Sequence, residues 1–130
     1  MKKLLFLLFA LFAPLFLGAD AIQWAASWDE AVEKAMKEEK KMMVLMTSER
    51  CRFCVRMEEE VFANDAIALR INEDFVPLKF DISKEPYPPA LKVRGTPTIY
   101  FISPREPEAM EAVVGYRGPM QFMQILHQLK

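Results

Sequence analysis

Cys51 and Cys54 are the two residues of this chain whose types and spacing could do chemistry together. They are the only cysteines among 130 residues, and two residues separate them. A thiolate is a nucleophile, and a second thiol three positions on can close a small disulfide ring with it. Closing so short a loop constrains the unfolded chain little, so the pair suits a disulfide that opens and closes better than a static one.

A static disulfide and a metal site are the alternatives for this pair. A structural zinc site needs about four ligands, whereas the chain offers two cysteines and one distant histidine, His127. Haem attachment would require histidine at position 55, which is Val55. We therefore expect a redox-active pair with no cofactor and no zinc bound within one chain, and we interpret His127 as a surface or packing residue.

The elements around the pair place Cys51 at the start of a helix. Residues 42–46 are apolar without alternation, which favours a strand covered on both faces. A helical pattern then runs to about residue 63, with Phe53, Met57 and Val61 along one face and Phe53 at least partly exposed. Because a helix N-terminus favours an anion, we expect the pKa of the Cys51 thiol to lie below that of free cysteine.

Arg50 and Arg52 flank Cys51. A cation within about 4–6 Å of the sulfur would stabilise the thiolate further, and a stabilised thiolate makes the disulfide more oxidising. Glu49 would oppose the two arginines. The alternative is that both guanidinium groups simply point into water.

Capping signals mark three further helices. Ser27 and Glu30 form a capping box before an amphipathic pattern that runs to about residue 40. Asn64 caps a helix over residues 65–73, and the Gly118–Pro119 pair opens the last helix with proline at its first position. The apolar residues of the helix over 65–73 are Ile67, Leu69 and Ile71.

Three more strands complete the pattern. Residues 75–81 alternate in polarity, and Pro77 suggests that this strand lies at a sheet edge. Residues 98–102 and 112–116 are expected to pair as a hairpin across a turn at 103–107, and residues 90–93 to form one helical turn. The resulting α/β fold has a central mixed β-sheet of about four strands, flanked by helices on both faces.

The first 21 residues have the pattern of a secretory signal peptide. Lys2 and Lys3 precede an apolar run over residues 4–17, and small residues stand at 19 and 21. The run is short for a membrane span of about 20 residues, although an uncleaved anchor is the alternative. We expect export to the periplasm, where a disulfide persists, with contact to the membrane only through this segment before cleavage.

Removal of residues 1–21 leaves 109 residues, which suit one domain over 22–130. It also takes away two lysines and one aspartate, so the net charge of −1 becomes −2. A chain with this balance lacks the phosphate-neutralising charge of a nucleic-acid binder. We expect a monomer that binds no nucleic acid.

The chain resembles the thioredoxin superfamily over nearly all of residues 22–130. The resemblance rests on an apolar strand followed by Cys51 and Cys54, on the Gly95-Thr96-Pro97-Thr98 run before a second apolar strand, and on Gly115 ahead of the last helix. It is nearest to exported thioredoxin-like proteins, in which a helix containing tryptophan, here around Trp24 and Trp28, replaces the first strand.

The resemblance implies a role for each of these residues. Cys51 would attack a substrate disulfide and Cys54 would resolve the mixed disulfide. Pro97 would be cis and pack beside the disulfide, and the Thr96 backbone would face an incoming peptide. Beyond the resemblance, we expect Arg52 and Phe53 to contact the substrate, with Phe53 in an apolar patch that includes Pro97. Tyr116 either extends this patch or packs in the core.

Four positions depart from thioredoxin itself. Arg50 stands where thioredoxin has tryptophan, and Arg52 and Phe53 replace its Gly-Pro. Leu45 stands where thioredoxin has a buried acid. This exchange leaves Glu49, Glu58 or water to accept the proton of the resolving thiol.

Together these features predict an exported thiol–disulfide oxidoreductase. It would exchange disulfides with protein thiols and with an unidentified redox partner. The alternatives are a Cu(I) metallochaperone that uses the cysteine pair and a methionine, and a reductant of haem-attachment cysteines.

Overall fold

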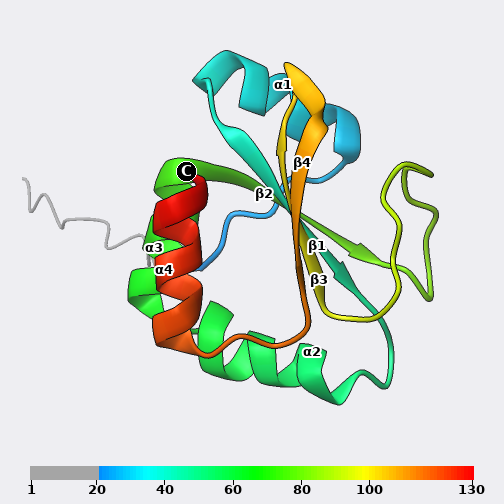
Figure 1. Cartoon of the computed structure of the whole chain (residues 1–130), viewed down its shortest axis with the longest axis vertical. Coiled ribbons are helices and arrows are strands. Elements are labelled where there is room, and N and C mark those ends of the chain that lie inside the picture. The colour runs from blue at the N-terminus through cyan, green and yellow to red at the C-terminus, as the bar shows by residue number, and fades with distance from the viewer. Residues whose placement is uncertain (1–20) are drawn as a thin grey trace, which may run out of the picture.

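The chain alternates helices and strands in the order expected from the sequence (Figure 1). The computed structural model describes residues 21–130, so the predicted signal peptide lies outside the described residues except for Ala21. The elements are α1 (Trp28–Glu38), β1 (Lys41–Thr47), α2 (Arg52–Arg56), the π-helix η1 (Met57–Phe62), α3 (Asp65–Asp74), β2 (Phe75–Asp81), β3 (Thr98–Ser103), β4 (Glu106–Val114) and α4 (Pro119–Leu129). None of the helices in this described part is long and apolar enough to cross a membrane.

The four strands form one mixed sheet in the order β2-β1-β3-β4. β1 pairs in parallel with β2 and antiparallel with β3, and β3 and β4 form an antiparallel hairpin. The expected mixed sheet of four strands is therefore confirmed. β2 is an edge strand, as Pro77 predicts, and its outer edge is partly covered because the Ala25 N–H donates to the Pro77 carbonyl at 2.8 Å.

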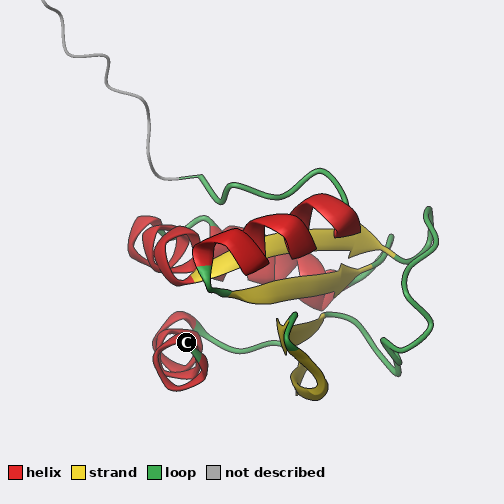
Figure 2. Ribbon diagram, turned by 90° about the horizontal axis from the view of Figure 1, so that it is seen from above, coloured by secondary structure: helices red, strands yellow, loops and turns green. Residues whose placement is uncertain are grey.

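Helices cover both faces of the sheet over its buried strands β1, β2 and β3, which confirms the expected flanking by helices on both faces. α1 packs on one face, where Ala31 and Ala35 meet alternate residues of β1 and β2. α3, α4 and η1 cover the other face, where Phe62, Ile71 and Phe122 pack against Met43 and further residues of the sheet. Figure 2 shows helices beside the strands, with α4, marked by the C-terminus, seen end-on.

The capping signals read from the sequence place three helix starts correctly. The Ser27 hydroxyl accepts a hydrogen bond from the Glu30 N–H, and the Asn64 side chain accepts one from the Ile67 N–H. α4 begins at Pro119, directly after Gly118. The side chains of Ser27 and Asn64 accept hydrogen bonds from backbone N–H groups of the first turn that have no partner within the helix. Proline at the first position of α4 has no N–H that would need a partner.

The structure corrects three local predictions. β4 starts at Glu106 rather than 112 and ends at Val114 rather than 116, and the turn before it is shorter than the expected 103–107. Leu69 was expected among the apolar core residues of α3, but it is 49% exposed. Ala68 is buried instead, because it lies on the same face of the helix as Ile67 and Ile71. Residues 90–93 form no helix; the Leu91 N–H closes a turn on the Pro88 carbonyl instead.

The helix after Cys51 reaches the expected end but changes its winding. α2 passes directly into η1 at Met57, and the Ala63 N–H donates to the Glu58 carbonyl five residues earlier. Met57, Val61 and Phe62 are all buried in this segment, while Phe53 remains exposed. The wider π turn allows these three side chains to enter the core together.

Glu39 ends α1 in a left-handed conformation, with φ of 55°. This conformation costs a residue with a Cβ about 1–2 kcal/mol, whereas glycine adopts it freely. We expect Glu39→Gly to raise the free energy of unfolding by roughly 0.5 kcal/mol, after the entropic cost of glycine and the loss of an exposed ion pair with Arg105.

The matched control is Glu33→Gly, the same exchange inside α1, which should lower stability by about 1 kcal/mol. Urea unfolding of both variants measures the two effects. Equal losses of stability at both positions would contradict the prediction.

Candidate functional site

Cys51 and Cys54 form a disulfide at the junction between β1 and α2, with their Cα atoms 5.2 Å apart. Cys51 is the N-cap residue of α2, where its sulfur accepts a hydrogen bond from the Cys54 N–H at 3.2 Å. Its side chain is partly exposed, whereas Cys54 is 6% exposed. The pair therefore presents one reachable sulfur, that of Cys51, and keeps the other beneath it.

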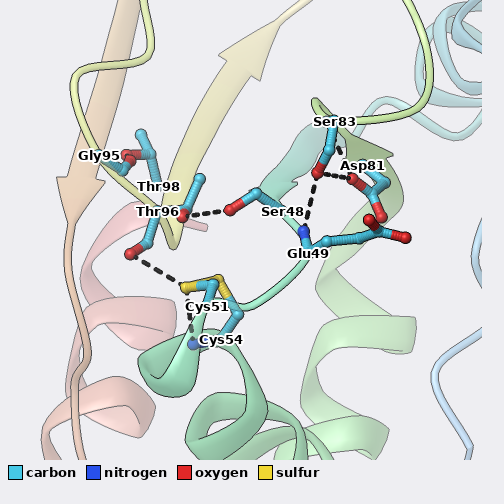
Figure 3. Close-up of a disulfide and its surroundings, with 9 residues drawn as sticks. All are labelled: Ser48, Glu49, Cys51, Cys54, Asp81, Ser83, Gly95, Thr96 and Thr98. Carbon is cyan, nitrogen blue, oxygen red and sulfur yellow. Dashed lines mark hydrogen bonds between the residues drawn. A yellow bond between two sulfur atoms is a disulfide. The ribbon is translucent and has the colours of Figure 1, made fainter.

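The loop before β3 lies against the reachable sulfur. The Thr96 carbonyl oxygen is 3.4 Å from Cys51 Sγ, and in the dithiol form the Cys51 S–H could donate to it (Figure 3). The Thr96–Pro97 peptide bond is cis, the isomer that the family resemblance implies, and Pro97 is buried. The structure thus brings Thr96 and Pro97 together with the cysteine pair.

Two hydrogen-bonded contacts, which the sequence did not reveal, hold the loop between β1 and Cys51. The Ser48 and Thr96 hydroxyls are 2.8 Å apart, so this loop is tied to the one that carries Pro97. On its other side the Glu49 N–H donates to the Ser83 hydroxyl at 2.8 Å, and that hydroxyl donates to Asp81 (Figure 3). The bonds from Ser83 lower the pKa of the Asp81 carboxyl.

The Ser48–Thr96 contact is partly buried, so its loss should be measurable. We expect Ser48→Ala to lower the free energy of unfolding by about 0.5–1.5 kcal/mol. Thr96→Val, which removes the same hydrogen bond from the other side, should add little when combined with Ser48→Ala. Urea unfolding of the two single variants and the double variant measures the coupling, and strictly additive losses would show that the hydroxyls do not interact.

The flanking arginines are both exposed, and Phe53 is 46% exposed. The Arg52 guanidinium lies over the Phe53 ring, 5.8 Å from its centroid. Arg50 adopts a left-handed backbone conformation with φ of 57° immediately before Cys51. Arg52 and Phe53 thus form a small cation–aromatic surface beside the disulfide.

The two carboxylates expected to accept the proton of the resolving thiol, Glu49 and Glu58, are both ion-paired. Leu45, at the position of thioredoxin's acid, is buried in the core. Glu49 is ion-paired with Lys84 at 3.1 Å, and this contact raises the pKa of the Lys84 ammonium. Glu58, one helical turn beyond Cys54, is ion-paired with Lys79 at 3.1 Å.

Tyr116 joins a polar cluster rather than an open apolar patch with Phe53. Its hydroxyl donates to the Glu60 carboxylate, which also binds Arg56 at 3.2 Å, and the Arg56 guanidinium lies 4.2 Å from the Tyr116 ring centroid. The hydrogen bond from Tyr116, helped by Arg56, lowers the pKa of Glu60. The same bond raises the pKa of Tyr116.

His127 is exposed on α4, consistent with a surface residue. Among residues 21–130 no group of three or more histidine, cysteine, aspartate or glutamate side chains is placed to hold a metal ion.

A strand that leads to a cysteine pair at a helix start, faced by a cis-proline loop, defines a thioredoxin-fold protein. The chain belongs to the thioredoxin-like domain family, whose model matches residues 28–130. This fold and the close cysteine pair together support thiol–disulfide oxidoreductase chemistry in general.

Solved structures share this fold. A thioredoxin from Thermus thermophilus superposes with a TM-score of 0.70 at 26% identity, over 83% of this chain and 86% of the thioredoxin. The DsbH oxidoreductase superposes with a TM-score of 0.68 at 17% identity, over 92% of this chain and 91% of that chain. Because only 17% of the aligned residues are identical, the similarity to DsbH concerns the fold alone.

Among curated proteins, human spermatogenesis-associated protein 20 is 37% identical over 65 residues, which are 50% of this chain. The rat protein of the same name is 35% identical over the same length. The match spans 8% of the length of each of these relatives.

Proposed function

We propose that this protein is an exported thiol–disulfide oxidoreductase that exchanges disulfides with protein substrates through Cys51 and Cys54. The observation that carries the proposal is the asymmetry of the pair: Cys51 is partly exposed beside the Thr96 carbonyl, while Cys54 is buried one turn below. One sulfur is thus reachable by another protein, and the second is placed to reach the first.

In the reducing direction the Cys51 thiolate attacks one sulfur of a substrate disulfide. The substrate S–S bond breaks, a mixed disulfide forms, and the other substrate sulfur leaves as a thiolate that takes up a proton. Thr96, Pro97, Arg52 and Phe53 would contact the substrate at this stage. The Thr96 backbone lies beside the sulfur, and Phe53 offers an exposed apolar ring.

Cys54 completes the cycle. Its thiol loses a proton to water or to Glu58, and the resulting thiolate attacks Cys51 Sγ. The mixed disulfide breaks, the substrate leaves as a dithiol after protonation, and two electrons have passed from the protein to the substrate. The reverse sequence donates the protein disulfide, and the reduction potentials of the partners decide the direction.

Cys51 should titrate as an acidic thiol. The Cys54 N–H that reaches its sulfur at 3.2 Å stabilises the thiolate, and the opposing Glu49 is neutralised by Lys84. We expect a thiolate absorbance titration of the reduced protein to give a pKa for Cys51 below the value of about 8.5 for free cysteine. A value at or above this would contradict the proposed activation.

Residues 1–21 would act as a signal peptide, and residues 22–130 as one monomeric thioredoxin-like domain in the periplasm. The charged start, apolar run and small residues of this segment support the assignment. Expression of the full chain with cell fractionation, and mass spectrometry of the N-terminus, would test both the compartment and the cleavage after Ala21.

Reduction of insulin by dithiothreitol tests the activity, with Cys51→Ser as the control. The wild-type protein should accelerate the reaction, and the variant should not. Absence of cysteine-dependent turnover together with tight Cu(I) binding would favour the metallochaperone instead, since soft sulfur ligands suit that ion.

A further inference from the structure

The surface around the disulfide is more cationic than the chain as a whole. Residues 22–130 carry a net charge of −2. Three of the segments that meet at the site, residues 50–57, 90–98 and 115–119, contain no carboxylate side chain. They contain six cations: Arg50, Arg52, Arg56, Lys92, Arg94 and Arg117.

Hydrogen-bonded contacts join these three segments around the reactive sulfur. Cys51 Sγ is 3.4 Å from the Thr96 carbonyl, the Gly115 N–H donates to the Pro97 carbonyl at 2.8 Å, and the Arg117 N–H donates to Met57 Sδ at 3.5 Å. The segments therefore form one continuous rim, which we call the basic rim, beside the Cys51 sulfur.

Most of this positive charge is not neutralised by the protein itself. Arg56 is paired with Glu60 at 3.2 Å. Among residues 21–130 no carboxylate forms an ion pair with the four exposed cations Arg50, Arg52, Lys92 and Arg94, and Arg117 binds only backbone carbonyls. The nearest acid in the sequence, Glu49, is already held by Lys84 at 3.1 Å.

We infer that the basic rim selects substrates whose disulfide is flanked by acidic residues; this inference rests on the proposed function. An extended segment that presents a disulfide sulfur to Cys51 must pass beside the rim, because the rim segments carry Cys51 itself and the Thr96 carbonyl that lies 3.4 Å from its sulfur. Carboxylates on the segment would meet unpaired guanidinium and ammonium groups, and Phe53 and Val55, 46% and 53% exposed, would contact apolar residues. Complementary charge of this kind acts mainly on the rate of encounter.

The test uses two synthetic peptides that each contain one intramolecular disulfide and differ only in three flanking glutamates or three flanking lysines. We expect the reduced protein to react with the acidic peptide about tenfold faster than with the basic peptide at low ionic strength. The difference should fall toward unity at high salt, where the Debye length shortens. Equal rates at low salt would overturn the inference.

Arg52→Glu, which reverses one charge of the rim, should remove most of the preference. Lys37→Glu is the matched control: it also reverses a charge, but it lies near the end of α1 that leads into the start of β1, away from Cys51. The control should keep the wild-type preference. A loss of preference in Lys37→Glu as well would assign the effect to net charge rather than to the rim.

A neutral small disulfide, hydroxyethyl disulfide, separates this inference from the proposed function. If reduced protein fails to react with it, the proposed thiol exchange is wrong. If it reacts while the two peptides react equally, exchange stands and the selectivity does not. Binding of the protein to anionic lipid vesicles, combined with equal peptide rates, would assign the rim to membranes instead.

Discussion

Exchange of Cys54 for serine should leave the first half of the reaction intact and stop the second. Cys51 remains partly exposed beside Thr96 and can still attack a substrate disulfide, but no second thiol is present to release the product. We expect Cys54→Ser to accumulate a covalent complex with a disulfide substrate, seen as an added mass on non-reducing gels and lost on treatment with dithiothreitol. Multiple-turnover reduction of insulin should fall to the uncatalysed rate.

Cys51→Ser is the matched variant, because it changes the same atom at the other position of the pair. It should form no complex, since the remaining thiol of Cys54 is 6% exposed and lies under Cys51. Trapping by Cys51→Ser alone would reverse the assignment of the two sulfurs, and equal trapping by both variants would contradict any distinction between them.

Local signals in the sequence predicted the framework of the site. The apolar run of β1, the cysteine spacing and the caps at Ser27 and Asn64 each act within a few residues, so they can be recognised without tertiary information. The edge position of β2 followed from Pro77 alone, because proline lacks the N–H that an inner strand needs.

The hydrogen-bonded contacts that hold the loop between β1 and Cys51 could not be predicted from local signals. Ser48 and Thr96 are 48 residues apart, and Glu49 and Ser83 are 34 apart. No spacing rule links such pairs, which become neighbours only once β1, β2 and β3 lie side by side.

β4 was placed too late for a related reason. Its first residues, Glu106 and Pro107, have the composition of a turn, and most of this strand is exposed. Alternation of polarity identifies a strand only where one face is buried. Here pairing with β3, rather than burial, holds the outer part of the hairpin, and Ser103 pairs directly with Glu106.

The second large effect is expected in the core beneath α4. Phe122 is 0% exposed and packs edge-on against Phe62, with ring centroids 5.8 Å apart. Truncation of a buried phenylalanine to alanine removes its transfer free energy and leaves a cavity, so we expect Phe122→Ala to lower the free energy of unfolding by about 3–5 kcal/mol. Urea unfolding, followed by the fluorescence of Trp24 and Trp28, measures the change.

Met120→Ala is the control on the same helix, since Met120 is 82% exposed and its truncation should change stability by less than about 0.5 kcal/mol. A loss below 1 kcal/mol in Phe122→Ala would contradict the packing of α4 on the sheet. Phe122 packs in the core that α4 shares with η1, the continuation of the helix that begins after Cys51, but it is not one of the residues of the site. The folded fraction of Phe122→Ala should therefore retain exchange, while the total activity of the variant falls with its stability. Loss of activity at full stability would instead place Phe122 in the reaction itself.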